Sequence, residues 1–271
     1  MRLQVLICTI GAEGIARVLN AVHPRVAGVG YLVAWQQPDG DIPVPQELAE
    51  RQDFQVFIHR SRGISRNRNF AISCASAPLC LMGDDDVDYS ADGLQGIMTE
   101  FDACPEADII AARYTCFDRY VKPYPQRLTD FANAPKGYYV TAFEIAFRRN
   151  AVSRRVRFNE NISIGTPVLR CGEEDVFICD ARRAGLRVFV SPVTIGSHDH
   201  PTTGERDAGE EYFAMTHGAV MSHLHPFSWP ARLLIHALRE RRAGRWAFFP
   251  YMRACLAGVR YARRNKVFAA K

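Results

Sequence analysis

The chain has 271 residues, 48% of them hydrophobic, which is enough for one large domain with its own core plus an appendage. Its eight cysteines form no Cys-x-x-Cys pair, which argues against a zinc site and favours free thiols in a reducing compartment. The net charge of +5 is uneven, because residues 226–271 carry eleven basic groups and one acid, whereas residues 1–225 carry 23 basic and 28 acidic groups.

The chain opens with an apolar segment, Leu3 to Ile10. This segment is too short for a signal sequence and lacks a small-residue cleavage site, so we predict a first strand and a cytoplasmic protein. The following turn, Gly11-Ala-Glu-Gly14, lacks the third glycine and the spacing of a dinucleotide-binding fingerprint, and the sequence contains no P-loop. A Rossmann dehydrogenase is therefore disfavoured.

Apolar strands then alternate with stretches of helical periodicity. This rhythm is typical of an α/β fold with a largely parallel, doubly wound sheet. The predicted strands are 3–10, 30–34, 55–58, the apolar run before Asp84, 109–112 and 186–190, and the predicted helices are 14–22, 65–75, 92–101 and 173–185.

The segment 63–69, Gly-Ile-Ser-Arg-Asn-Arg-Asn, is predicted to begin a helix, with Ser65 as the N-cap and Arg66 and Arg68 in or near the first turn. A helix N-terminus attracts anions through its free N–H groups, and guanidinium groups strengthen that attraction for phosphate. Ion pairs with surface acids are the alternative for the two arginines. Because an acidic strand end follows, we favour a site for a nucleoside diphosphate.

The most informative feature is a triplet of carboxylates at a strand end, Asp84, Asp85 and Asp86. In an α/β sheet, ligands bind at the carboxyl ends of the strands. Neighbouring carboxylates repel one another unless a cation lies between them, and oxygen ligands favour Mg²⁺ or Mn²⁺. A solvated acidic loop is the simpler alternative. An EF-hand calcium loop is excluded, because Tyr89 and Gln95 occupy the positions of its glycine and its glutamate.

A second acidic cluster, Glu173, Glu174 and Asp175, occupies the first turn of the helix 173–185. The helix dipole favours carboxylates there, and this effect alone could explain them. Alternatively, one of them could act as a general base that takes a proton from an attacking hydroxyl.

Two histidines, His198 and His200, follow the strand 186–190. They alternate along the chain, so in an extended segment they point to opposite sides, and only one could bind a metal held by Asp86. A surface or hydrogen-bonded structural histidine is the alternative for each.

The basic tail, residues 226–271, is predicted to form two amphipathic helices. The first begins at Ser228 with Pro230 in its first turn, and the second begins near Pro250. Through residues 228–266 such helices could lie on an anionic membrane surface, but neither is long and apolar enough to span a bilayer. Packing on the rest of the chain, or on a second subunit of a homo-oligomer, is the alternative. No pattern of a nucleic-acid-binding module is present.

In this order, the motifs resemble those of family 2 glycosyltransferases with the GT-A fold. The resemblance covers about residues 1–205 and implies an α/β GT-A catalytic domain over 1–225, a mostly parallel mixed sheet flanked by helices, with a basic helical appendage over 226–271. The motifs that carry it are the first strand ending in Thr9, the Gly63–Asn69 turn, the Asp84–Asp86 strand end, and the Glu173–Asp175 helix start with Arg182 and Gly185 behind it.

The resemblance also implies roles for single residues. Asp84 to Asp86 match the DxD motif, so Asp84 would lie near the ribose and Asp86 would hold Mn²⁺ or Mg²⁺ at the diphosphate of a nucleotide sugar. Asp175 matches the catalytic base of inverting members, with Glu174 as its partner. The residues expected to contact the nucleotide are Thr9, Gln36, Arg66, Arg68, Asn69, Asp84 and Asp85, and those expected at the metal are Asp84, Asp86, His198 and His200.

One departure from the family concerns the base of the nucleotide. The family has an aspartate after the second strand that contacts the base, and here only Gln36 and Asp39 stand near that position. The donor implied is therefore a UDP-, GDP- or dTDP-sugar without further distinction.

The implied reaction transfers a sugar, with inversion, to a hydroxyl of a glycan or lipid-linked saccharide, as in polysaccharide biosynthesis. The expected location is the cytoplasm, where the tail could attach the protein peripherally to the inner face of the cytoplasmic membrane. A sugar nucleotidyltransferase is one alternative, but it usually carries a Gly-rich basic loop after the first strand, where this chain is short and acidic. The other alternative is a non-catalytic carbohydrate-binding or membrane-docking protein of the same fold.

Overall fold

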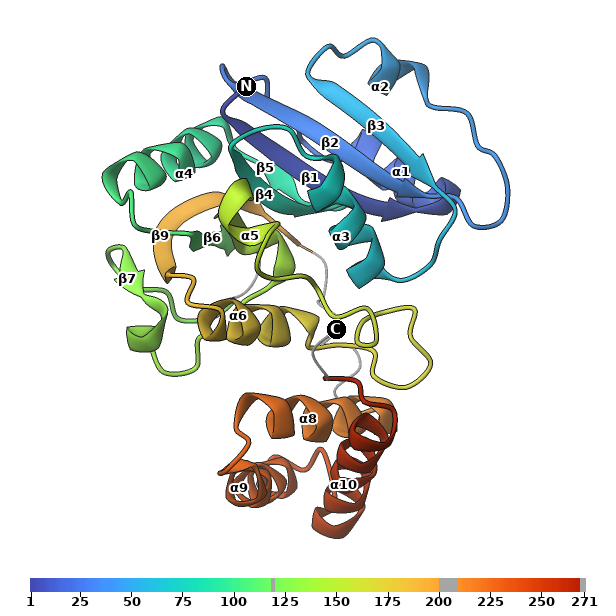
Figure 1. Ribbon diagram of the computed structural model, residues 1–271, viewed down its shortest axis with the longest axis vertical. Coiled ribbons are helices and arrows are strands. Elements are labelled where there is room, and N and C mark those ends of the chain that lie inside the picture. The colour runs from blue at the N-terminus through green and yellow to red at the C-terminus, as the bar shows by residue number, and fades with distance from the viewer. Residues whose placement is uncertain (118–119, 200–208, 269–271) are drawn as a thin grey trace. The chain divides into compact units, whose positions relative to one another are not determined.

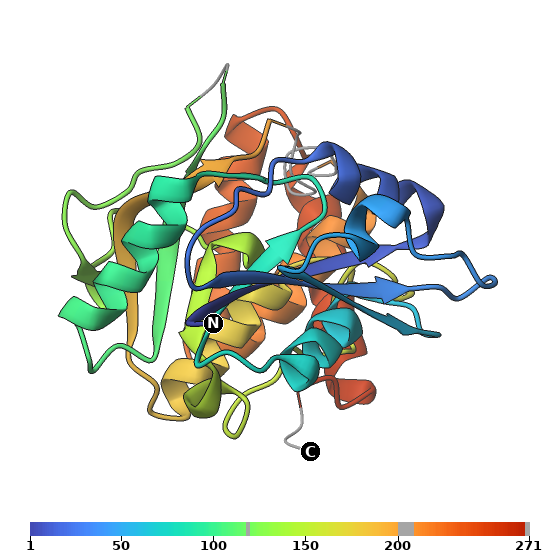
Figure 2. The ribbon, with the colours of Figure 1, turned by 90° about the horizontal axis from the view of Figure 1, so that it is seen from above.

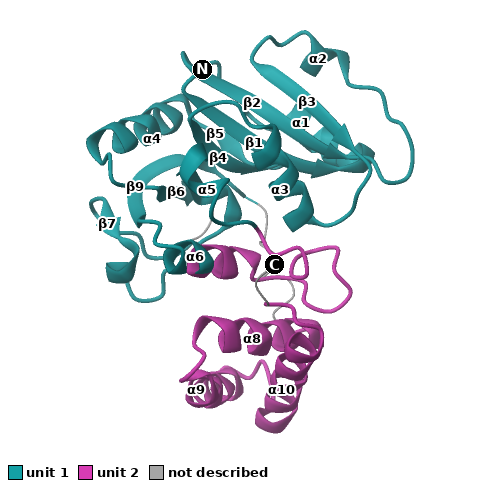
Figure 3. Cartoon of the chain, viewed as in Figure 1, with its two compact units in different colours: residues 1–157, 180–200 teal, residues 158–179, 201–271 magenta. Residues whose placement is uncertain are grey.

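The structure is a computed structural model that describes residues 1–117, 120–199 and 209–268. The chain divides into two compact units, which Figure 3 distinguishes by colour. The first unit comprises residues 1–157 and 180–200, and the second comprises residues 158–179 and 201–271. Helix α6, Glu173–Arg183, contributes residues to both.

Among the described residues, nine strands form one mixed sheet in the first unit (Figure 1). They are β1 Leu3–Ile10, β2 Val29–Gln36, β3 Phe54–His59, β4 Leu79–Asp84, β5 Asp88–Tyr89, β6 Ile109–Thr115, β7 Thr129–Asp130, β8 Ile145–Arg148 and β9 Val188–Ser197. Their order is β3-β2-β1-β4-β8-β6-β9-β5, with β7 paired to β9. The first four strands in this order are parallel, and β6 is parallel to β9. The predicted α/β fold with a mostly parallel mixed sheet is confirmed.

Three of these strands are not predicted from the sequence. β5 and β7 have two residues each, and β8 has four. β8 lies between β4 and β6 and runs antiparallel to both. Its sequence, Ile-Ala-Phe-Arg, is too short to show a periodicity, so its place in the sheet depends on its two neighbours and not on a local signal.

Helices cover both faces of the sheet. Helix α1, Gly11–Asn20, and helix α3, Ile64–Cys74, lie on opposite faces (Figure 2). Helix α4, Ala91–Ala103, begins at Ser90, whose hydroxyl accepts a hydrogen bond from the N–H of Gly93 at 3.0 Å. Helix α4 shares a hydrophobic core with α1 and with one face of β1, β2 and β4. The short helices α2 and α5 span Gln46–Ala49 and Arg149–Val152.

The start of α3 differs from the prediction. The N-cap is Gly63, with φ of 102°, and Ser65 is buried inside the helix. A positive φ suits glycine and would strain other residues, so the turn into the helix comes two residues earlier than Ser65 would place it. The prediction of Ser65 as the N-cap is therefore wrong.

In the second unit, the described residues form three further helices, α8 Glu211–Leu224, α9 Trp229–Arg242 and α10 Phe248–Arg264. Pro230 lies in the first turn of α9, as predicted, and α10 begins two residues before Pro250. A Cβ atom on Gly218 of α8 or on Gly258 of α10 would lie 2.2 Å or 1.8 Å from a backbone oxygen of the other helix. These two glycines therefore allow the helix backbones to touch. Within the described residues, no helix is long and apolar enough to span a membrane.

Candidate active site

The three consecutive aspartates at the end of β4 have three different partners. Asp84 is the last residue of β4 and lies beside Cys8 of β1 in the strand register. The carboxyl ends of the parallel strands β1, β2 and β4 therefore meet at this edge of the sheet.

Asp85 is held by side chains of the β1 strand and the α1 helix. Its Oδ2 atom accepts a hydrogen bond of 2.6 Å from the hydroxyl of Thr9. Nε and Nη2 of Arg17 donate to its two carboxylate oxygens at 2.8 and 3.0 Å. Asp85 is only 8% exposed, and its carboxylate raises the pKa of the Arg17 guanidinium above its ordinary value through these hydrogen bonds. Asp85, the middle acid of the triplet, therefore links α1 to the sheet through hydrogen bonds.

Gly14 is required beside this ion pair. A Cβ atom at position 14 would lie 2.1 Å from Oγ1 of Thr9 and 3.1 Å from Oδ2 of Asp85. The hydroxyl of Thr9 can approach the helix only because residue 14 has no side chain. The Gly11–Gly14 turn, which does not match a dinucleotide-binding fingerprint, thus makes room for the contact between Thr9 and Asp85 at the end of β4.

Asp84 faces a buried arginine. Nη2 of Arg68, from the first turns of α3, lies 3.5 Å from Oδ1 of Asp84, and the two side chains are 5% and 29% exposed. The thiol of Cys8 lies close to both, and its burial raises its pKa well above the ordinary value. A guanidinium in such a poorly solvated place interacts more strongly with anions than one in water.

Asp86 faces His198, which follows the last residue of β9. Nε2 of His198 lies 3.3 Å from Oδ1 of Asp86. The imidazole is buried, stacks on Phe143 at 5.1 Å between ring centroids, and meets the edge of Tyr114 at 6.3 Å. Its backbone N–H donates to the carbonyl of Thr115 at 2.9 Å, so the sheet fixes its position. His200, the other predicted metal ligand, lies outside the described residues.

The ligand atoms that Asp86 and His198 offer suit a divalent cation. Carboxylates are ligands that Mg²⁺ and Mn²⁺ both accept, and Mg²⁺ binds through one or two of them together with substrate phosphates. An imidazole is a less usual ligand for Mg²⁺, so the combination of Asp86 with His198 fits Mn²⁺ better.

Asn67, which the sequence analysis does not single out, joins α3 to the ends of β1 and β2. Its Nδ2 atom donates to the carbonyl oxygens of Thr9 at 3.1 Å and Ala34 at 2.9 Å, and its Oδ1 atom accepts from Nε2 of His59 at 2.9 Å. The residue is completely buried. Asparagine is unfavourable inside a helix, so its presence there could have indicated such a contact.

The remaining predicted nucleotide contacts differ in exposure. Gln36 is buried at the end of β2, and its Nε2 atom donates to the hydroxyl of Ser61 at 2.8 Å. Asn69 is also buried, whereas Arg66 is exposed on α3. Asp39, in the loop after β2, forms an exposed ion pair with Arg62 just before α3.

A buried ion pair lies next to the aromatic rings that hold His198. Nζ of Lys122 donates to Oε2 of Glu144 at 2.5 Å, and the two side chains are 1% and 0% exposed. The hydroxyl of Tyr124 donates to Oε1 of Glu144, also at 2.5 Å. The ammonium group lies 5.2 Å from the ring centroid of Tyr114, which also contacts the imidazole of His198. The sequence shows only a lone lysine between tyrosines, which is too weak a signal to find this pair.

The predicted catalytic acids belong to the second unit. Glu174 and Asp175 lie in the first turn of α6, as the sequence predicts. Asp175 is exposed, Glu174 is half-buried, and their neighbour Glu173 is buried. The preceding Gly172 has a φ of 81°, so a glycine is favoured where the chain turns into the helix.

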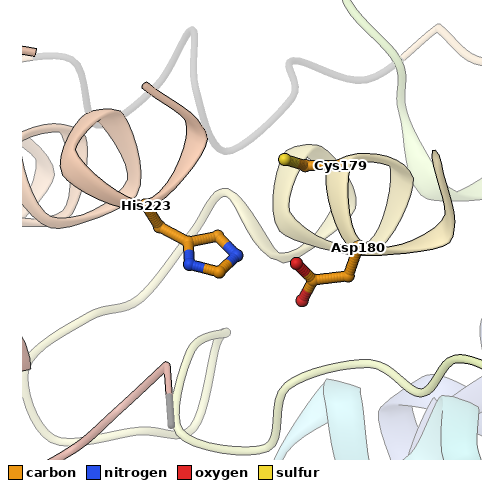
Figure 4. Close-up of side chains that lie close together, drawn as sticks. All are labelled: Cys179, Asp180 and His223. Carbon is orange, nitrogen blue, oxygen red and sulfur yellow. The ribbon is translucent and has the colours of Figure 1, made fainter. Parts of the chain in front are cut away.

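A cysteine and a histidine also lie together in the second unit. Sγ of Cys179 on α6 and a ring nitrogen of His223 on α8 are within 4.8 Å of each other, and Figure 4 shows both together with Asp180, the next residue of α6. The ring of His223 also stacks on Phe268 at 4.3 Å between centroids. This packing accounts for the position of His223 in the unit.

The profile of glycosyl transferase family 2 matches residues 38–177, just over half of the chain. The chain therefore belongs to this family, as the order of its sequence motifs predicts. Its fold is the GT-A fold of these enzymes. No curated protein matches the sequence.

Solved structures with the same fold include TarS of S. aureus. The match to TarS has a TM-score of 0.60 at 14% identity and covers 91% of this chain but only 44% of TarS. A match to TarS 1–349 in complex with UDP-GlcNAc has a TM-score of 0.60 at 12% identity and covers 91% of this chain and 74% of the other. The mannosyltransferase PcManGT from Pyrobaculum calidifontis, in complex with GDP-Man and Mn²⁺, matches with a TM-score of 0.54 at 14% identity, over 100% of this chain and 76% of the other. Identities this low establish the fold alone.

Proposed function

We propose that the protein is an inverting, metal-assisted glycosyltransferase that moves a sugar from a nucleoside-diphosphate sugar to a hydroxyl acceptor. The observation that carries the proposal is the end of β4, where Asp84 faces the buried Arg68 and Asp86 faces His198. Membership of family 2 supports it. Further support comes from TarS, which binds UDP-GlcNAc, and from PcManGT, which binds GDP-Man and Mn²⁺.

In this proposal the first unit binds the donor. Asp86 and His198, with Asp84, would hold Mn²⁺ or Mg²⁺, which when bound offsets the negative charge of the diphosphate. Asp84 would also contact the ribose, and Arg68 would place a positive charge beside the departing nucleoside diphosphate. Thr9, Gln36, Arg66 and Asn69 are the other proposed nucleotide contacts. For Asp85, the hydrogen bonds with Thr9 and Arg17 support a positioning role in this site.

Asp175 is the proposed general base, with Glu174 as its partner. It would take the proton of the acceptor hydroxyl while that oxygen attacks the anomeric carbon on the side opposite to the leaving diphosphate, so the configuration inverts. The exposure of Asp175 supports this role, because an acceptor can reach its carboxylate from solvent.

The substrates and the location are proposed at the level of chemical class. The donor is a UDP-, GDP- or dTDP-sugar, and the acceptor is a glycan or lipid-linked saccharide of polysaccharide biosynthesis. We place the protein in the cytoplasm, at the inner face of the cytoplasmic membrane. The buried free thiols of Cys8, Cys80 and Cys255 support a reducing compartment, and the basic tail supports the membrane.

Calorimetric titration with UDP, GDP and dTDP, with and without Mn²⁺, tests the donor site. We expect one of them to bind in a metal-dependent way, and Asp86→Asn to weaken that binding by at least about tenfold. The matched control is Asp102→Asn, on the exposed side of α4, which should bind as the unaltered protein does. If Asp86→Asn binds metal and nucleotide with unchanged affinity, the metal site is wrong.

A second experiment separates the base from the donor site. Asp175→Asn should keep the affinity for the nucleotide but abolish transfer and the slow hydrolysis of the donor sugar. Unchanged turnover would remove Asp175 from the role of base. Synthesis of a nucleotide sugar from a sugar phosphate and a nucleoside triphosphate would instead identify a sugar nucleotidyltransferase.

A further inference from the structure

Helix α9 of the second unit has apolar residues on two sides. Leu233 and Ala237 are completely buried in a cluster with residues of α8 and α10. Leu234, Ile235 and Leu238 are 46%, 49% and 41% exposed. Since successive residues of a helix are turned by about 100°, these three share a side that points away from the buried pair. We call Leu234, Ile235 and Leu238 the outer strip.

Arginines border the outer strip on both sides. By helical position, Arg232 and Arg239 lie along one edge, Arg241 along the other, and Arg242 at its C-terminal end, and all four are exposed. The only acid in the sequence of α9, Glu240, is bound by two hydrogen bonds of 2.7 Å from Arg245. This ion pair lowers the pKa of Glu240. Because Glu240 is engaged by Arg245, no acid of α9 is left to balance the positive charge of the four arginines around the strip.

We propose that α9 docks on a lipid bilayer that carries anionic headgroups, with the outer strip entering the boundary between headgroups and acyl chains. The four arginines would contact lipid phosphates at the same depth. An exposed apolar strip edged by cations is the pattern of helices that lie in a membrane interface. This inference rests on the membrane location proposed above and assigns it to a defined surface, and it uses none of the residues proposed for transfer.

The charges favour a bilayer over a second copy of the chain. In a two-fold contact through the outer strip, the arginines of one copy would meet those of the other, because α9 offers no acid there to oppose them. A nucleic acid would match the arginines but would leave the apolar strip in water. An anionic bilayer provides both an apolar layer and negative charge.

Sedimentation with phosphatidylcholine vesicles, with and without phosphatidylglycerol, tests the proposal on the full chain. We expect binding to the anionic vesicles that weakens as salt is added. The triple variant Leu234→Asn, Ile235→Asn, Leu238→Asn should lower the partition coefficient by about tenfold or more. The variant Arg232→Gln, Arg239→Gln, Arg241→Gln should also lower it, and most of its remaining binding should be insensitive to salt.

The matched control is Val22→Asn with Ile164→Asn, which alters apolar residues that are 54% and 51% exposed outside α9. It should bind vesicles as the unaltered chain does. Circular dichroism and metal-dependent nucleotide binding show whether each variant is folded, independently of the membrane result. The proposal is overturned if the unaltered chain does not bind anionic vesicles, or if the outer-strip variant binds them equally well. It is also overturned if light scattering finds a lipid-free dimer that the outer-strip variant dissociates.

Discussion

Arg17 and Asp85 form a two-bonded ion pair between α1 and the end of β4, with N–O distances of 2.8 and 3.0 Å. This pair engages the middle member of the acidic triplet, while Asp84 faces Arg68 and Asp86 faces His198. The middle acid of the triplet is therefore held by a contact that involves neither of its neighbours.

Replacing Arg17 should destabilise the first unit. In Arg17→Met the buried carboxylate of Asp85 loses both guanidinium bonds, and we expect the free energy of unfolding to fall by about 2 kcal/mol. The effect is smaller than for a fully buried pair because the Arg17 side chain is 44% exposed. The control is Arg2→Met, which breaks the ion pair between Arg2 and Asp102, whose side chains are 51% and 60% exposed. This variant should lower the free energy of unfolding by less than about 1 kcal/mol. Urea unfolding measures both, and equal losses would contradict the prediction.

Asn67 should be more important for stability than its place in a helix suggests. In Asn67→Leu the carbonyls of Thr9 and Ala34 lose their donor in a buried place, so we expect a loss of about 2–4 kcal/mol in the free energy of unfolding. Asn265→Leu removes a similar amide bond, to the carbonyl of Tyr261, at an exposed position and should cost less than about 1 kcal/mol. A similar loss in the two variants would mean that the contact of Asn67 with the strand ends contributes little.

The buried pair of Lys122 and Glu144 should show strong coupling. Lys122→Met and Glu144→Gln each leave one buried group without its partner, and we expect each to lower the free energy of unfolding by about 3–5 kcal/mol. The double variant should lose clearly less than the two single losses combined, because it leaves no unpaired charge. Urea unfolding of the four proteins forms the test. Additive losses would show that the two side chains act independently.

Stability should decrease in weakly acidic solution because of His23. Its ring is buried against Tyr31 and Phe54, and this burial lowers its pKa from 6.5 to about 4. Between these pH values the unfolded chain binds a proton that the folded protein does not, so the free energy of unfolding falls as the pH drops from about 6.5 to about 4. One such histidine accounts for at most about 3 kcal/mol over this range.

The measurement is urea unfolding of the unaltered chain and of His23→Gln at a series of pH values. In the variant the decrease between pH 6.5 and 4 should be smaller, with the remainder due to other groups such as His217, whose pKa is also lowered to about 4 by burial. If the two proteins lose stability in parallel, folding does not lower the pKa of His23.

The sequence predicts the parts of the fold that are buried on both faces. β1, β2 and β4 are continuous apolar runs because helices cover both sides of the sheet, and such runs are visible without knowledge of the partners. β8 and α8 are not predicted, for different reasons. β8 has only four residues, and α8 carries apolar residues around most of its circumference, so it lacks the polar face that would mark it as a helix.

The candidate site is predictable in its residue types but not in its pairings. The positions of Asp84 to Asp86, Arg68 and His198 follow from motifs in the chain. That Asp85 would bind Arg17, 68 residues earlier, depends on how α1 packs on the sheet, and no local pattern contains this information. The same holds for Glu144 and Lys122, whose contact requires the loop between β6 and β8 to fold back on itself.

Cys8 and Cys80 are buried on the neighbouring strands β1 and β4, and burial raises the pKa of Cys80 to about 12 and that of Cys8 further. At neutral pH neither sulfur is a thiolate in the folded protein, so an alkylating reagent can modify them only when local opening exposes them. The rate of alkylation at Cys8 and Cys80 therefore reports local opening around the strands that lead to the acidic triplet, and a nucleotide bound there should slow it without any assay of sugar transfer.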